Sequence, residues 1–225
     1  SAVTVTDSGL AGTVAVTALE SSLSADLGNI TASTYTVALS TAGGDLALST
    51  ADLTNATVNI SGTNQLTVDA ASTVTGTTFD MAAASTITGT AAALSAVTVT
   101  DSGLAGTVAV TALNATLTAD LSNITANSVT AAFDADGIFA GSLGTTAVVT
   151  VAGGVTMTTT AAIVSSNTII GDITLSDTAI SDAGALNTID TNTSGTVDAT
   201  AATSITGTAA ELITIGDADD AGTIL

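Results

Sequence analysis

The stretch SAVTVTDSGLAGTVAVTAL occupies residues 1–19 and recurs without change at residues 95–113. Within it, residues 2–6 and 13–17 alternate apolar and polar side chains. Alternation with a period of two is typical of a β-strand that buries one face. An Asp-Ser-Gly sequence follows the first segment, and these residues favour a tight turn. The repeat therefore predicts short strands joined by turns, present at least twice in the chain.

A third copy of this pattern begins near the other end of the sequence. TSITGTAAEL at 203–212 parallels STITGTAAAL at 85–94, and ITIGDADDAGTI then follows the pattern of VTVTDSGLAGTV. We therefore divide the chain into a first long repeat at 1–94, a second at 95–212 and the start of a third at 213–225. The second repeat is longer by about one short unit, as expected where units stack one on another.

The insertion of a short unit indicates how the repeats are built. A solenoid can gain a coil because each coil contacts only its neighbours. We predict an all-β protein, a parallel β-solenoid of stacked short coils, with coils of about 22–26 residues forming one continuous stack. The alternative is a pair of tandem immunoglobulin-like β-sandwiches, because about 100 residues is the usual size of such a domain.

Other segments extend this prediction along the chain. Alternation predicts strands at residues 57–61, 173–176 and 212–215. The alanine-rich stretch 82–94 has helical propensity, but Thr86, Thr88 and Gly89 interrupt it. We predict a strand there as well.

The composition of the 225 residues excludes several classes of protein. Lys, Arg, His, Cys, Pro and Trp are absent, and the formal net charge is −20. Without a basic surface the chain has no means of binding a nucleic-acid backbone. Without His, Cys or Lys most nucleophile–base pairs cannot be built, so we expect no enzymatic activity. No apolar run reaches about 18 residues, so we expect no membrane insertion.

One segment resembles the start of a calcium-binding loop. Oxygen-bearing side chains occur at alternate positions from residue 190, with a glycine at the sixth position. Hard cations such as Ca²⁺ prefer oxygen ligands in this order. The glutamate expected at the twelfth position is replaced by Ala201. The predicted ligands of a Ca²⁺ ion are Asp190, Asn192, Ser194, Thr196 and Asp198.

Six asparagines stand in the Asn-x-Ser/Thr pattern that accepts N-linked glycans. The alternative is that asparagines occupy corners of the stack, where a left-handed backbone is tolerated. The candidate glycosylation sites are Asn29, Asn55, Asn59, Asn114, Asn123 and Asn192.

Threonines recur as Thr-x-Thr pairs, and both hydroxyls of such a pair lie on one face of a strand. The pairs are Thr4/Thr6, Thr73/Thr75, Thr86/Thr88, Thr98/Thr100 and Thr156/Thr158. Stacked pairs would form threonine ladders, which are the working surface of some ice-binding solenoids. An adhesin or ice-binding module that presents such ladders is therefore the alternative function.

The segment LNTIDTNTSGTVDATAATSITGTAAEL, residues 186–212, resembles units of very large Thr/Ala/Ser-rich repeat proteins of marine cyanobacteria. The TVDAT and SITGTAA elements carry the resemblance. It implies an extracellular or cell-surface protein and provides no catalytic residue. We therefore expect a structural protein of a filament, sheath, surface layer or stalk. Its expected partner is itself, end to end or side by side, together with glycans or cations.

Overall fold

The computed structural model describes residues 5–6, 13–19, 30–31, 34–39, 45–48, 57–60, 65–68, 75–81, 84–113, 119–144 and 147–225. In the strands before residue 57 the description covers the backbone alone. The chain divides into two compact units. The first comprises Ser1–Thr111 and Leu121–Val129, and the second comprises Ala112–Asp120 and Thr130–Leu225. These boundaries differ from those of the long repeats.

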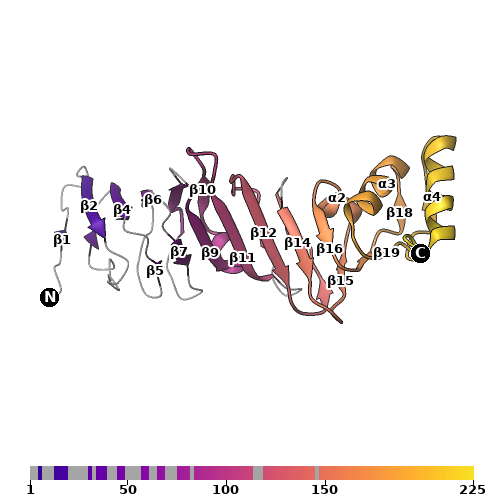
Figure 1. Ribbon diagram of the computed structural model, residues 1–225, viewed down its shortest axis with the longest axis horizontal. Coiled ribbons are helices and arrows are strands. Elements are labelled where there is room, and N and C mark those ends of the chain that lie inside the picture. Colours follow the sequence, from indigo (N-terminus) through magenta and orange to yellow (C-terminus); the bar gives the residue numbers. More distant parts are fainter. Residues whose placement is uncertain are drawn as a thin grey trace. The chain divides into compact units, whose positions relative to one another are not determined.

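The first unit consists mainly of short parallel strands (Figure 1). One sheet has the order β2-β4-β6-β8-β10, and β5, β7, β9 and β11 pair in that order. The strands are β1 (Val5–Thr6), β2 (Thr13–Leu19), β3 (Ile30–Thr31), β4 (Thr34–Leu39), β5 (Asp45–Leu48), β6 (Thr57–Ile60), β7 (Gln65–Val68), β8 (Thr78–Met81), β9 (Thr86–Thr90), β10 (Thr98–Thr100) and β11 (Thr107–Leu113).

A nearly constant register relates these strands. Thr57 lies opposite Thr78, and Thr78 in turn lies opposite Thr98, so the coils of this unit are slightly shorter than we predicted. The pairings β4–β6, β6–β8, β8–β10 and β9–β11 are all parallel, whereas an immunoglobulin-like sandwich is built from antiparallel pairs. The sandwich alternative is therefore wrong, and the chain has a β-rich parallel fold.

The register places similar side chains one above another. Val58, Phe79 and Val99 lie opposite one another in β6, β8 and β10, and all three are buried. Their neighbours in sequence are less buried, since Thr78 is half-buried and Thr98 is exposed. Alternation within each strand thus becomes a continuous apolar column, which the hydrophobic effect stabilises by about 1.5–3 kcal/mol for each large buried side chain.

The second unit combines parallel strands with helices. Four strands pair in the order β13-β15-β17-β19, while β14 pairs with β16 and β18 with β20. The strands are β12 (Ser128–Phe133), which begins in the first unit, β13 (Gly137–Ile138), β14 (Ala147–Val151), β15 (Met157–Thr159), β16 (Thr168–Ile170), β17 (Ile173–Leu175), β18 (Ala179–Ile180), β19 (Val197–Asp198) and β20 (Ser204–Ile205). The helices are α2 (Ala161–Val164), α3 (Ala183–Asn192) and α4 (Ala209–Ala221).

Strand predictions at 57–61 and 173–176 are confirmed by β6 and β17, but two others need correction. Within 82–94, β9 is followed by one helical turn, α1 (Ala91–Leu94). The hydroxyl of Thr90 accepts a hydrogen bond from the backbone N–H of Ala93 and caps this turn. The alanines then favour the helix.

The prediction of a strand at 212–215 is wrong, because these residues lie in α4. Thr208 and Glu211 form a capping box at the start of the helix. Gly222 ends it with φ at 76°, a left-handed conformation that glycine adopts without strain. In the part of the chain that the structure describes, no helix is both long and apolar enough to cross a membrane.

Candidate functional site

Aspartate carboxylates connect neighbouring strands of the parallel sheets. Asp80, in β8, accepts hydrogen bonds from the hydroxyl of Thr100 at 3.1 Å and from the backbone N–H of Ser102 at 3.3 Å. Thr100 lies directly opposite Asp80 in β10. The Ser102 hydroxyl also donates to the second carboxylate oxygen at 3.1 Å. One side chain thus ties the end of β8 to the turn that follows β10.

Asp101 begins the turn between β10 and β11 and is only 7% exposed. Its carboxylate accepts hydrogen bonds from the backbone N–H groups of Ala105 at 3.3 Å and Gly106 at 2.8 Å, which closes the turn. It also accepts one from Asn127 at 3.0 Å, immediately before β12. A charged acceptor makes each of these bonds stronger than a bond between neutral groups.

Three further aspartates repeat this arrangement in the second unit. Asp136 accepts the N–H of Thr156, Asp172 that of Thr196, and Asp177 that of Ala161, each at 2.7 Å. In all five cases at least one donor is distant from the carboxylate along the chain. With no Lys, Arg or His in the sequence, the available donors are amides and hydroxyls. These five residues, Asp80, Asp101, Asp136, Asp172 and Asp177, are the bridging aspartates.

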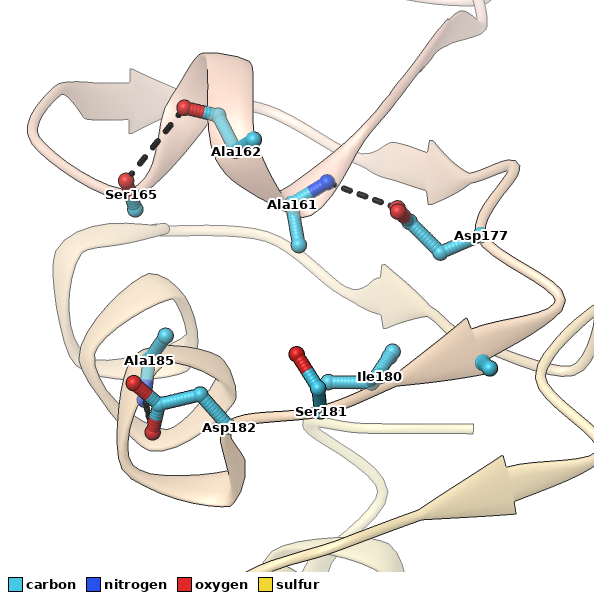
Figure 2. Close-up of a pocket in the computed structure, with 9 residues that line it drawn as sticks. Ala161, Ala162, Ser165, Asp177, Ile180, Ser181, Asp182 and Ala185 are labelled. Atoms are coloured by element: carbon cyan, nitrogen blue, oxygen red, sulfur yellow. Dashed lines mark hydrogen bonds between the residues drawn. The ribbon is translucent and has the colours of Figure 1, made fainter.

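A pocket of about 190 Å³ lies between α2, β18 and the start of α3 (Figure 2). Its walls include Ala161, Ala162, Ile180 and Ala185, and two carboxylates stand at its border. Both carboxylates already accept backbone hydrogen bonds. Asp177 binds the N–H of Ala161, and Asp182 caps α3 by accepting the N–H of Ala185 at 3.0 Å. The pocket is smaller than the usual range for small-molecule sites, which begins at roughly 300 Å³.

The candidate calcium ligands are not arranged as a loop. Asp190 and Asn192 lie in the last turn of α3 rather than in a loop. The Ser194 hydroxyl accepts the N–H of Gly171 at 3.2 Å. Thr196 donates its N–H to Asp172, and Asp198 lies in β19. The described residues contain no group of three acidic side chains placed to hold a metal, and the Ca²⁺ site at residues 190–198 stays a prediction.

Asp198 has a defined local partner. Its carboxylate accepts hydrogen bonds from the Thr200 hydroxyl at 2.7 Å and from the Thr200 backbone N–H at 3.0 Å. The hydroxyl bond first, and the backbone bond second, hold the pKa of Asp198 below its ordinary value because both stabilise the ionised form.

The candidate glycosylation sites lie in different surroundings. Asn123 is exposed in a turn, and its backbone carbonyl accepts the N–H of Val99. Asn192 is half-buried in the last turn of α3. The backbone of Asn59 lies in β6. Asn29, Asn55 and Asn114 lie outside the described residues.

In the sheet that contains β4, β6, β8 and β10, threonine pairs do not stack as a double ladder. Thr36, Thr57, Thr78 and Thr98 lie opposite one another in β4, β6, β8 and β10. The next column of that register contains Ala38, Asn59, Asp80 and Thr100. Threonine thus occupies this column in β4, β6, β8 and β10, whereas β2 contributes Ala15, and the pairings of this sheet do not place a second threonine column beside it.

The sequence analysis did not identify the bridging aspartates. A weak signal was present, because Asp80 ends the strand motif TFD and Asp101 follows the strand motif TVT. Their donors, however, lie in other strands, which a local pattern does not reveal. A comparison with family models, with curated proteins and with solved structures found no match to this chain.

Proposed function

We propose that this chain is a structural repeat protein of the extracellular space or the cell surface, built as a parallel β-solenoid. Its role would be to form, or contribute to, a filament, sheath, surface layer or stalk. The observation that carries the proposal is the repeated parallel register, in which Thr36, Thr57, Thr78 and Thr98 follow one another at nearly equal spacing. A register that repeats can be continued by adding units, without changing the contacts already made.

The bridging aspartates support a mechanical role. Each places a charge-assisted hydrogen bond between segments that are distant in sequence, in addition to the backbone bonds of the sheets. Separation of two neighbouring strands would therefore break backbone and carboxylate bonds together. This arrangement supports stiffness along the stack.

The composition supports an exposed location for this assembly. A net charge of −20 with no basic residue keeps copies soluble and attracts cations from the medium. The absence of Lys and Arg also removes the cleavage sites of trypsin-like proteases. Cation binding and N-glycosylation stay predictions. Ser194, among the candidate calcium ligands, and Asn123, among the candidate glycosylation sites, are exposed.

Two measurements test this proposal. Antibodies against the chain should label intact, unpermeabilised cells of its source, with electron microscopy placing the label on a surface structure. Label confined to the cell interior would overturn the extracellular role. Small-angle X-ray scattering should then be measured on chains joined in tandem. We expect a rod whose length increases by about 4.8 Å, the spacing of neighbouring strands, for each coil added. A compact particle whose length does not grow would contradict the solenoid.

A further inference from the structure

The loop between β12 and β13 contains the only position in the 225 residues at which glycine follows an aspartate or an asparagine, Asp136-Gly137. Such a pair is chemically reactive, because glycine has no side chain to hinder its amide nitrogen. The nitrogen attacks Cγ of the aspartate, the carboxyl hydroxyl leaves as water, and a five-membered succinimide forms. Water then opens either carbonyl of the ring, which gives aspartate or isoaspartate. One water molecule is released and one is taken up, so no further reactant is needed.

The backbone explains why a glycine stands at this position. Gly137 has a φ of 143°, a conformation that residues with a side chain adopt only under strain. It begins β13 and lies opposite Met157 of β15. The turn into β13 therefore requires glycine directly after Asp136, and the fold itself imposes the reactive pair.

In the folded chain both reacting groups are bound to one residue, Thr156. The carboxylate of Asp136 accepts the N–H of Thr156 at 2.7 Å, and Gly137 donates its own N–H to the carbonyl of Thr156 at 3.2 Å. We call these two hydrogen bonds the Thr156 clamp. While the clamp is closed, the attacking nitrogen and the carboxylate are both held by Thr156, so the reaction requires the clamp to open.

A second bridging aspartate of the same unit forms an equivalent clamp and provides an internal comparison. Asp172 accepts the N–H of Thr196 at 2.7 Å, and Ile173 donates its N–H to the carbonyl of Thr196 at 2.9 Å. Ile173 begins β17 and is buried. Its branched side chain crowds the amide nitrogen, so this clamp has the same hydrogen bonds but lacks the reactive glycine.

The position of the Thr156 clamp in its sheet favours local opening. β13 has only two residues and is the first strand in the order β13-β15-β17-β19. Asp136 and Thr156 are both exposed. Opening of a short, exposed segment costs less free energy than unfolding of the whole protein. The Gly137 nitrogen is therefore released from time to time while the rest of the unit stays folded.

We propose that Asp136-Gly137 is a site of spontaneous isoaspartate formation, at which the folded chain is modified when the Thr156 clamp opens. Isoaspartate adds a methylene group to the main chain and brings the carboxylate closer to Cα. Phe139, which follows in the chain, is fully buried and donates its N–H to Thr158 at 2.7 Å. The lengthened loop no longer matches the spacing between the clamp and Phe139, so β13 separates from β15. This inference goes beyond the proposed function and does not depend on it.

The first experiment incubates the whole chain for several weeks at physiological temperature and pH, either folded or unfolded in urea. Isoaspartate is located by digestion with a protease that cleaves before aspartate but not before isoaspartate. We expect progressive loss of cleavage before Asp136, whereas cleavage before Asp172 persists. The reaction should be slower in the folded chain by the factor by which the fold protects the Thr156 N–H from hydrogen exchange. Unchanged cleavage before Asp136, or equal rates in folded and unfolded chains, would overturn the proposal.

The second experiment removes the donor that the carboxylate binds. Thr156→Pro deletes this N–H next to the start of β15, where proline is tolerated. It should raise the rate in the folded chain about tenfold, the factor expected for loss of a hydrogen bond to a charged acceptor. Thr196→Pro, the matched control, should produce no isoaspartate at Asp172, because Ile173 follows it.

Asp136→Glu should abolish the modification at this position, because the larger ring that glutamate would form closes far more slowly. A folded Thr156→Pro variant that reacts no faster than the unsubstituted chain would refute the role of the clamp. If that variant does not fold, the comparison of reaction and exchange rates in the unsubstituted chain decides, since a reaction faster than the exchange allows would refute it equally.

Discussion

Replacing Asp101 tests whether the bridging aspartates hold neighbouring strands together. Its carboxylate accepts three backbone N–H groups, from Ala105, Gly106 and Asn127, and the side chain is buried. Asp101→Ala removes all three bonds. Asp101→Asn keeps one oxygen acceptor and replaces the other oxygen with an amide donor, which cannot accept a bond.

The expected loss follows from the burial of the three donors. Gly106 is buried, so its unpaired N–H would cost about 1–3 kcal/mol. Ala105 and Asn127 are exposed, and water can replace most of what the carboxylate gives them. We therefore expect Asp101→Ala to lower the free energy of unfolding by about 3 kcal/mol, and Asp101→Asn by about half as much.

Urea denaturation followed by far-ultraviolet circular dichroism measures this loss. Asp217→Asn is the matched control, because Asp217 is exposed in the middle of α4, and a surface substitution of this kind changes stability by at most about 0.5 kcal/mol. Hydrogen exchange should also show lost protection at Gly106. The reasoning fails if Asp101→Ala costs no more than the control, or if exchange at Gly106 is unchanged.

Three further predictions concern other parts of the chain. Gly89→Ala should destabilise the first unit by about 1–3 kcal/mol in urea denaturation. The reason is that the new Cβ would lie 3.0 Å from Cγ of Leu94 and 3.1 Å from a backbone carbonyl oxygen of β7. The control is Gly153→Ala, whose new Cβ meets no atom within 4 Å. Leu104→Asn should raise the melting temperature, because Leu104 is 80% exposed and has a φ of 54°, which asparagine adopts at lower cost; a lower melting temperature would contradict this. Thr200→Val should raise the pKa of Asp198 in a carbon-detected NMR titration, because the hydroxyl bond is the larger cause of its depression. Since the pKa of Asp198 is lower in the folded state, its contribution to stability is present above the pKa of the unfolded chain and is lost as the pH falls through the folded value; an unchanged pKa in the variant would refute the assignment.

Local patterns predicted the strands well and the helices poorly. Alternation located β6 and β17, because a strand with one buried face repeats every two residues. The segment 212–215 alternates in the same way but lies in α4. The capping box of Thr208 and Glu211 was visible in the sequence and outweighs the short alternating run. Attention to caps as well as to period would have given this helix.

The predicted calcium loop shows a different limit. Its residue types and spacing are those of a cation site, yet α3 extends through Asp190 and Asn192. Asp182 caps the start of α3, and Leu186 and Ile189 are buried along it. Packing of these apolar side chains favours the helix over an extended loop, which a list of oxygen-bearing residues does not reveal.

The sequence by itself determined the repeats, the short strands and the uncompensated negative charge, because each of these is a property of neighbouring residues or of composition. Only the tertiary structure decided which strand edges are covered and what the carboxylates bind. Asp101 accepts a bond from Asn127, far along the chain. The same ITGTA motif is buried or half-buried at residues 87–91 but mostly exposed at residues 205–209. The physical reason is that hydrogen-bond partners and burial depend on which distant segments meet, and identical local sequence can meet different neighbours.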